Sequence, residues 1–126
     1  MESLTIKETK YTPQINMDAI SGVIEMTGKS YPENTFDFYA PVMQWLNDYF
    51  SDENEKLTVI NMEIIYFNSS SSKLFFDFFD VCDAKKNSHN IEINWIYEED
   101  NENAKEAGED FIEDFESLCI NMVVKA

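Results

Sequence analysis

Alternating hydrophobic and polar residues predict two long β-strands in the middle of the chain. The first covers residues 57–67, which are rich in β-branched and aromatic side chains. One face of this strand is expected to carry Ile60, Met62, Ile64 and Tyr66. The second strand covers residues 91–97, and one of its faces is expected to carry Ile91, Ile93, Trp95 and Tyr97. The more polar opposite face of this second strand indicates that helices cover mainly one side of the sheet.

Shorter strands are predicted near both ends of the chain. Residues 4–6 form a possible first strand. Residues 14–18 and 22–28 flank a turn that contains Gly22, and this arrangement predicts a β-hairpin. Residues 117–124, "SLCINMVV", predict the last strand.

Apolar residues at helical spacing predict a helix within residues 30–50. Its apolar stripe consists of Phe38, Val42, Trp45 and Tyr49, widened by Leu46. Ser30 and Glu33 have the spacing of a capping box, and Asn34 is a competing cap. Pro41 has no N–H to donate to the preceding turn, so we expect a kink or a restart near residue 40.

Two further helices complete the predicted order of elements. The stripe that follows the first long strand consists of Leu74, Phe75, Phe78, Phe79 and Cys82. Residues 104–110 predict a short helix that Gly108 weakens. A strand, a helix and a strand joined by a crossover of this length indicate a parallel pair. The whole order predicts an α/β fold, with a mixed β-sheet and helices mainly on one face, in a single domain over residues 1–126.

The chain is strongly acidic, and its charge limits the partners it can have. It carries 25 acidic residues against nine basic ones, all of them lysines, for a formal net charge of -16 over 126 residues. Basic patches and arginine forks bind phosphate backbones, so we expect neither nucleic acid nor membrane insertion. Ten of the acids lie between Glu98 and Glu116, where Lys105 is the only base. This segment is expected to be a solvated surface or, as a second possibility, a partner surface.

Cysteine and histidine give no sign of a metal or cofactor site. Cys82 and Cys119 both lie in apolar runs without a CxxC pattern, so we expect two buried free thiols in a reducing compartment. The single histidine, His89, lies in a polar turn. The first ten residues contain no apolar signal core, and no run approaches the length of a membrane span. We therefore expect a cytoplasmic protein without metal or cofactor.

Four consecutive serines stand at the predicted corner between a strand and a helix, in "YFNSSSSK" at residues 66–73. The first N–H groups of a helix have no partner within it, so a Ser or Asn side chain can cap them. The same N–H groups and the positive end of the helix dipole favour a phosphate carried by a serine. Lys73 lies within a turn of such a phosphate. Capping needs only one hydroxyl, so both interpretations stay open on the residues alone.

Serine hydrolase chemistry is not expected. A nucleophilic serine needs a base, and His89 is predicted to lie at the opposite end of the sheet from the serines. The "GxSxG" pattern of a nucleophile elbow is also absent from the sequence.

Four motifs follow one another along nearly the whole chain: "KYTPQI", "SYPENTFDFYAPVMQWL", "YFNSSSSK" and "NWIYEEDNENAKEAGEDF". Taken in this order, they resemble the SiaC family of bacterial regulatory phosphoproteins. The resemblance implies a STAS-like fold, similar to that of the anti-sigma-factor antagonists. It also implies a protein that regulates a partner and catalyses no reaction.

The resemblance further implies a phosphorylation switch. The acceptor in the family is the hydroxyl residue after the Asn of the serine motif, which corresponds here to Ser69. The family usually has Thr there, so the departure leaves Ser70 as second choice. A kinase with a histidine-kinase-like fold and a PP2C-type phosphatase are the implied modifying enzymes. The unmodified form is implied to bind and activate a diguanylate cyclase in cyclic-di-GMP signalling. The switch surface would consist of Asn68, Ser69, Ser70, Ser71, Ser72 and Lys73.

A constitutive acidic adaptor is the alternative hypothesis. In that case the serines act only as helix caps, and residues 98–116 dock a basic partner as in a partner-switching module. The two hypotheses differ in the effect of a negative charge at Ser69, which matters only for the switch.

Overall fold

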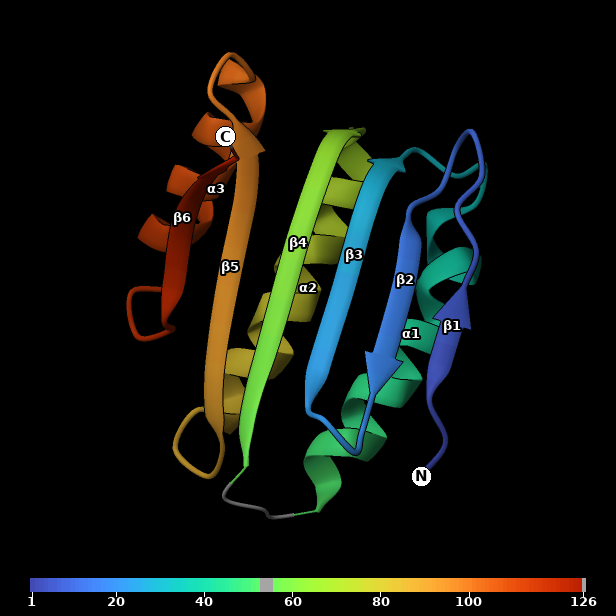
Figure 1. The fold of residues 1–126 in the computed structure, drawn as a ribbon, viewed down its shortest axis with the longest axis vertical. Helices are drawn as coiled ribbons and strands as arrows, with labels where there is room; N and C mark the ends of the chain where they lie inside the picture. Colours follow the sequence, from blue (N-terminus) through green and yellow to red (C-terminus); the bar gives the residue numbers. More distant parts are fainter. Residues whose placement is uncertain (53–55, 126) are drawn as a thin grey trace.

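The computed structural model describes residues 1–52 and 56–125. In this part of the chain, six strands form one sheet in the order β1-β2-β3-β4-β5-β6, and three helices cover one face of it (Figure 1). The strands are β1 (Leu4–Ile6), β2 (Gln14–Asp18), β3 (Val23–Ser30), β4 (Leu57–Phe67), β5 (Asn90–Glu98) and β6 (Ile120–Lys125). The helices are α1 (Thr35–Ser51), α2 (Ser69–Lys85) and α3 (Glu102–Asp114).

The sheet is mixed, as the sequence predicts. β1, β2 and β3 pair antiparallel, and β3, β4, β5 and β6 pair parallel. Gly22 has φ +75 in the turn between β2 and β3, a backbone conformation that glycine adopts at little cost. The predicted hairpin and the predicted parallel pair of long strands are therefore confirmed. Because β3 and β4 are parallel, their carboxyl ends lie side by side. The helices that follow them, α1 and α2, therefore begin at the same end of the strands.

The hydrophobic core lies between the sheet and the three helices. Phe75, Phe78, Phe79 and Cys82 of α2 are buried, as are Ile93, Trp95 and Tyr97 of β5. Both sets were predicted from their spacing, helical in one case and alternating in the other. The opposite face of the sheet is more polar and carries a row of amides in register. In this row Asn94 Nδ2 donates to Asn61 Oδ1 over 2.9 Å, and Asn121 Nδ2 donates to Asn94 Oδ1 over 3.1 Å.

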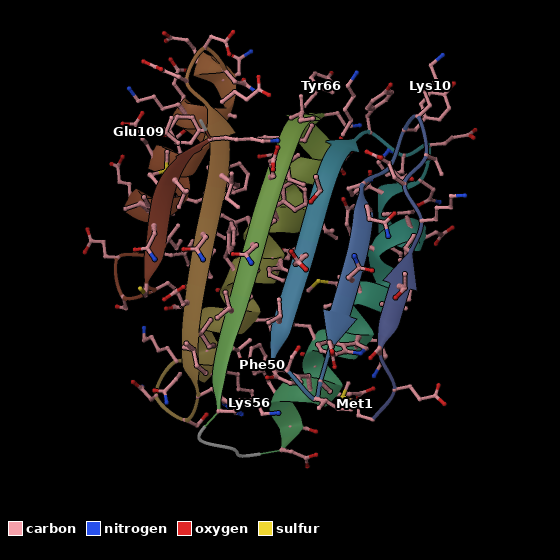
Figure 2. The ribbon with its side chains drawn as sticks, viewed as in Figure 1. Met1, Lys10, Phe50, Lys56, Tyr66 and Glu109 are labelled. Atoms are coloured by element: carbon pink, nitrogen blue, oxygen red, sulfur yellow. The ribbon has the colours of Figure 1, made fainter. Side chains whose placement is uncertain are left out.

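A β-bulge at the end of β4 changes which of its side chains are buried. Gly28 pairs with Ile64 and Lys29 pairs with Tyr66, so one residue of β4 is unmatched. After the bulge Phe67 faces the core, where its ring centroid lies 5.6 Å from that of Phe75. Tyr66 instead lies on the surface and is 53% exposed (Figure 2). The prediction that Tyr66 shares the buried face of Ile64 is therefore wrong.

Helix α1 begins at Thr35, later than the capping-box spacing suggested. Asn34 is the cap, and its Oδ1 accepts the N–H of Asp37 over 3.1 Å. Ser30 is buried at the end of β3, so it does not cap the helix. The helix runs through Pro41 without a restart. Pro41 and Asp37 are both exposed, so water can bond the Asp37 carbonyl that Pro41 leaves without a donor.

Helix α3 is longer than predicted and continues through Gly108 to Asp114. Gly108 does not end the helix, because it packs directly against the sheet. A Cβ atom at Gly108 would lie 2.5 Å from Trp95 Cδ1 and 2.6 Å from Met122 Sδ. The absence of a side chain therefore allows the helix to approach the sheet closely. The helical cost of glycine is offset by burial of Trp95, which is 1% exposed.

We expect Gly108→Ala to lower the free energy of unfolding by about 1–3 kcal/mol, since an added methyl group overpacks this contact. Urea unfolding followed by circular dichroism measures the change. Glu106→Ala, at an exposed position on the same helix, is the control and should stay within about 0.5 kcal/mol of the unsubstituted protein. An unchanged midpoint for Gly108→Ala would contradict the close contact.

Candidate functional site

The corner between β4 and α2 is closed by Asn68. Asn68 Oδ1 accepts the N–H of Ser71 over 2.9 Å, and the Asn68 carbonyl accepts the N–H of Ser72 over 3.0 Å. The Asn68 N–H donates to the Ser30 carbonyl over 3.1 Å and so ties the corner to β3. The side chain that caps the helix is therefore an asparagine, and no serine hydroxyl is required for that purpose.

Ser71 is used inside the protein. It is fully buried, and its Oγ lies 2.8 Å from Ser30 Oγ, which in turn hydrogen-bonds the Tyr39 hydroxyl. This chain of three hydroxyls links α2, β3 and α1. The sequence-based prediction placed Ser71 on the switch surface, but its hydroxyl is not accessible there. Helical spacing explains the difference, because Ser71 lies four residues before the buried Phe75 and shares its face.

Ser70 is exposed and joins the starts of two helices. Its Oγ accepts a hydrogen bond from Thr35 Oγ1 over 3.1 Å and lies 3.4 Å from Asn68 Oδ1. Thr35 is the first residue of α1, as Ser69 is of α2. Thr35 was not identified from the sequence. The signal was present, because both helices begin with an Asn cap followed by a hydroxyl residue, "NT" at 34–35 and "NS" at 68–69.

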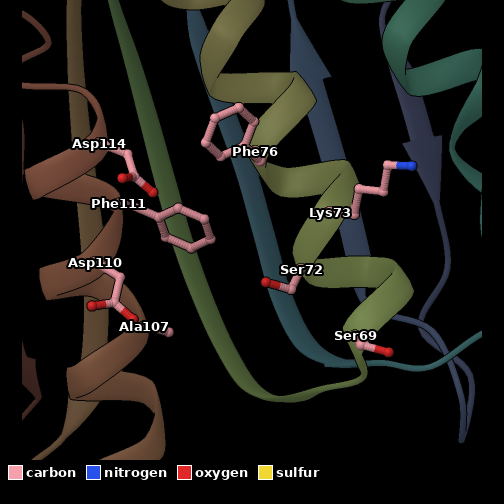
Figure 3. A pocket seen from close by; sticks show the side chains of 8 residues that line it. All are labelled: Ser69, Ser72, Lys73, Phe76, Ala107, Asp110, Phe111 and Asp114. Carbon is pink, nitrogen blue, oxygen red and sulfur yellow. The ribbon is translucent and has the colours of Figure 1, made fainter.

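Ser69 and Ser72 differ in the direction of their hydroxyls. Figure 3 shows Ser69 and Lys73 directed away from α3, whereas Ser72 is directed toward it. Ser72 faces a groove of about 450 Å³ between α2 and α3. The groove is lined by Ser69, Ser72, Lys73, Phe76, Ala107, Asp110, Phe111 and Asp114. Ser69 is exposed, and its Oγ has no hydrogen-bond partner among residues 1–52 and 56–125.

The surroundings of Ser69 suit a negative charge on the side away from α3. The N–H groups of Ser69 and Ser70 precede the first intrahelical bonds, and in the described part of the chain neither has an acceptor. The positive end of the helix dipole lies at the same point, and Lys73 is one helical turn away. On the far wall of the groove, Asp110 and Asp114 would repel an anion. A phosphate is therefore favoured at Ser69 over Ser72.

Burial of the hydroxyl chain raises the pKa of Tyr39 to about 12, while the hydrogen bond with Ser30 acts in the opposite direction. Folding therefore favours the neutral phenol. The stabilisation from this group is complete below its ordinary pKa of 10.0 and is lost as the pH rises toward about 12.

We expect the free energy of unfolding to fall by about 2–3 kcal/mol between pH 10 and pH 12 because of Tyr39. Tyr39→Phe should be less sensitive over the same range, since Phe does not ionise. Urea unfolding of both proteins at several pH values measures the difference. Identical pH profiles for the two proteins would contradict a buried neutral Tyr39.

The remaining candidate residues lie away from this corner. Cys82 is buried, and desolvation raises the pKa of its thiol to about 12. Cys119 is exposed, contrary to prediction, because it lies in the loop before β6 and not within the strand. His89 is buried just before β5, at the opposite end of β4 from the serines, and its Nε2–H donates to the Asp52 carbonyl over 2.9 Å.

Among the described residues, no cluster of His, Cys, Asp or Glu could hold a metal ion, and no helix is long and apolar enough to cross a membrane.

Comparison with known proteins agrees with this architecture. The mixed sheet with three helices on one face defines a small α/β protein, and an exposed serine stands at the start of α2. The chain belongs to the SiaC family of regulatory phosphoproteins, whose family model matches residues 6–125. An uncharacterised protein of Pseudomonas aeruginosa (strain UCBPP-PA14) is 32% identical over 115 residues, which are 90% of each chain.

Two solved structures share the fold over almost the full length. The crystal structure of apo-SiaC from Pseudomonas aeruginosa has a TM-score of 0.87 and 27% identity, covering 98% of this chain and 100% of that one. The crystal structure of the diguanylate cyclase SiaD in complex with its activator SiaC, also from Pseudomonas aeruginosa, contains a similar chain. That match has a TM-score of 0.90 and 28% identity, covering 97% of this chain and 99% of that one. The predicted mixed sheet with one covered face is thus confirmed, while the likeness to STAS domains stays a prediction.

Proposed function

We propose that this chain activates a diguanylate cyclase by binding it, and that phosphorylation of Ser69 ends the binding. The observation that carries the proposal is the environment of Ser69. It is the serine of the run whose hydroxyl is exposed, has no partner in the described structure and is directed away from acidic α3. Membership of a family of regulatory phosphoproteins supports a modified hydroxyl, and the SiaD–SiaC complex of Pseudomonas aeruginosa supports a cyclase as the partner.

Ser70 is the second candidate for the modification. Its hydroxyl accepts a hydrogen bond from Thr35 Oγ1 and lies near Asn68 Oδ1. A phosphate on Ser70 would therefore break the contact between the starts of α1 and α2. At Ser69 the structure, as far as it is described, shows no hydrogen bond of the hydroxyl that would have to be broken. Phosphorylation at Ser69 therefore costs less, and Ser69 is the preferred acceptor.

The switch acts by charge and by bulk. A phosphoserine adds roughly -1.5 to -2 charge at neutral pH to a surface that is already acidic. Asn68, Ser69, Ser70, Ser72 and Lys73 form the accessible part of the corner, where the dianion would meet the partner. The chain regulates its partner by binding to it and catalyses no reaction itself. A kinase with a histidine-kinase-like fold adds the phosphate, a PP2C-type phosphatase removes it, and the cycle takes place in the cytoplasm.

Reconstitution tests the proposal. The purified chain is combined with the diguanylate cyclases of its own organism and with SiaD of Pseudomonas aeruginosa, and cyclic-di-GMP is measured over time. The chain is then treated with its kinase, and phosphate is mapped by mass spectrometry. We expect activation by the unmodified chain and phosphate at Ser69. Failure to activate any of these cyclases would overturn the proposed partner, and phosphate found only at residues other than Ser69 would overturn the proposed site.

A further inference from the structure

We propose that the partner cyclase docks on a tyrosine row formed by Tyr11, Tyr31 and Tyr66, through an apolar segment that also carries carboxylates. This inference rests on the proposed function and identifies the part of the surface that makes the contact. The row was not among the residues singled out in the sequence. It lies beyond the serine corner, at the ends of β3 and β4 and in the loop before β2.

The three rings form a continuous surface. The ring centroids of Tyr11 and Tyr31 are 5.3 Å apart at an interplanar angle of 87°, and those of Tyr31 and Tyr66 are 5.5 Å apart at 77°. Tyr11 is 51% exposed and Tyr66 is 53% exposed. Edge-to-face contacts hold the rings in place, so little side-chain freedom is left to lose on binding. Tyr31, which is half-buried, holds the two exposed rings in place, and rigid tyrosines of this kind are typical anchors of protein interfaces.

The bulge in β4 produces this surface. Without it, regular alternation would direct Tyr66 into the core together with Ile64. The additional residue in β4 instead places Phe67 in the core and Tyr66 on the outer face, opposite Lys29. The bulge thus exposes a large aromatic side chain at the end of β4, beside Ile65, which is 49% exposed. Bulges are over-represented where a protein re-aims a side chain near a functional site.

The tyrosine row is continuous with the serine corner. Tyr66 stands two residues before Asn68, and the Asn68 N–H bonds the carbonyl of Ser30, the residue that precedes Tyr31. Phe36, which is 77% exposed, follows Thr35, whose hydroxyl bonds Ser70. A partner that covers the row therefore reaches the edge of the Ser69 site, where a phosphate would lie within the interface.

Charge identifies the chemistry of the docking segment. Lys10 Nζ lies 5.9 Å from the centroid of the Tyr11 ring, and Lys29 pairs with Tyr66 in the sheet. Figure 2 shows Lys10 and Tyr66 at one end of the molecule and Phe50 and Lys56 at the other. In the described part of the chain, neither Lys10 nor Lys29 forms an ion pair. Carboxylates of the partner would complement these lysines. Single-stranded nucleic acid also stacks on aromatic residues beside lysines, but a net charge of -16 opposes it.

The test measures affinity for the diguanylate cyclase that the unmodified chain activates in the reconstitution above. We expect Tyr66→Ala and Tyr31→Ala each to weaken binding by roughly 10- to 30-fold, the loss typical of an aromatic anchor. Tyr66→Phe keeps the ring and should retain most of the affinity. Ile20→Ala is the matched control, because Ile20 is 82% exposed in the hairpin turn at the opposite end of β3. Lys29→Glu should also weaken binding, and Lys85→Glu, at the far end of α2, should not.

The outcomes separate this inference from the proposed function. If no cyclase binds the unsubstituted chain, the proposed function fails and the inference fails with it. If the cyclase binds but Tyr66→Ala and Tyr31→Ala bind as well as the unsubstituted chain, the proposed function stands and the tyrosine row is excluded. Melting temperatures of all variants show that they are folded. Binding of a single-stranded RNA oligonucleotide that is lost in Tyr66→Ala would overturn the choice of a protein as the occupant.

Discussion

Ser69→Asp is expected to abolish activation of the cyclase while the chain stays folded. The carboxylate would stand at the exposed first residue of α2, where it repels an interface that a neutral hydroxyl permits. The folded state tolerates this charge, because an acid in the first turn interacts favourably with the helix dipole, by about 0.3–1 kcal/mol. The reference is the rate of cyclic-di-GMP formation with a saturating concentration of the unsubstituted chain. At the same concentration, we expect Ser69→Asp to give a rate increase that is smaller by at least about tenfold.

Two variants serve as controls for this result. Ser69→Ala keeps the site neutral and should activate the cyclase as the unsubstituted chain does. Ser117→Asp makes the same charge change at an exposed serine between α3 and β6, and it should leave activation unchanged. Equal activation by Ser69→Asp and Ser69→Ala would favour the constitutive adaptor, which predicts loss of binding when the acids of residues 98–116 are neutralised.

Ser71→Asp, two positions further on, is expected to lower the free energy of unfolding by more than about 3 kcal/mol. Ser71 is 0% exposed, and within the described residues its Oγ bonds the hydroxyl chain through Ser30. A carboxylate there would lose its hydration, would find no cation and would be too large for the space that a hydroxyl fills. The two aspartate substitutions should therefore have different effects. Ser69→Asp should lose activation and stay folded, whereas Ser71→Asp should lose stability.

Urea unfolding of Ser71→Asp measures this effect, with Ser71→Ala as the matched control. The alanine variant removes the hydroxyl without adding a charge, so it should cost only about 1–2 kcal/mol. If Ser71→Asp unfolds at the same urea concentration as the unsubstituted protein, Ser71 is not buried in solution and the hydroxyl chain is not formed.

The four serines have four different environments, and this explains why the run contains more hydroxyls than a helix cap requires. Asn68 caps the helix, Ser71 enters the buried hydroxyl chain, Ser70 bonds Thr35 and Ser72 faces α3, while the Ser69 hydroxyl has no partner among the residues that the structure describes. Periodicity located the strand-to-helix corner correctly. It could not distinguish the four serines from one another, because Ser30, the partner of Ser71, lies 41 positions earlier in the chain and Thr35, the partner of Ser70, lies 35 positions earlier.

The strands and the core stripes could be predicted because their spacing alone determines the side that is buried. The stripe of α2 and the alternation of β5 are the clearest cases. The exceptions arose where contacts distant in sequence decide the outcome. The bulge in β4 depends on its pairing with Gly28 and Lys29. Gly108 alone predicts a weakened helix, and only the structure shows that Trp95 and Met122 pack against it. Cys119 lies in an apolar run, but the strand begins one residue later.

The affinity of the cyclase for the chain with phosphoserine at position 69 tests the central claim most directly. Phosphoserine incorporated during synthesis places a true dianion at one known site, without dependence on the kinase. Isothermal titration against the unmodified chain should show binding weakened at least about tenfold, and addition of the phosphatase should restore it. Equal affinities of the two forms for the cyclase would contradict the account.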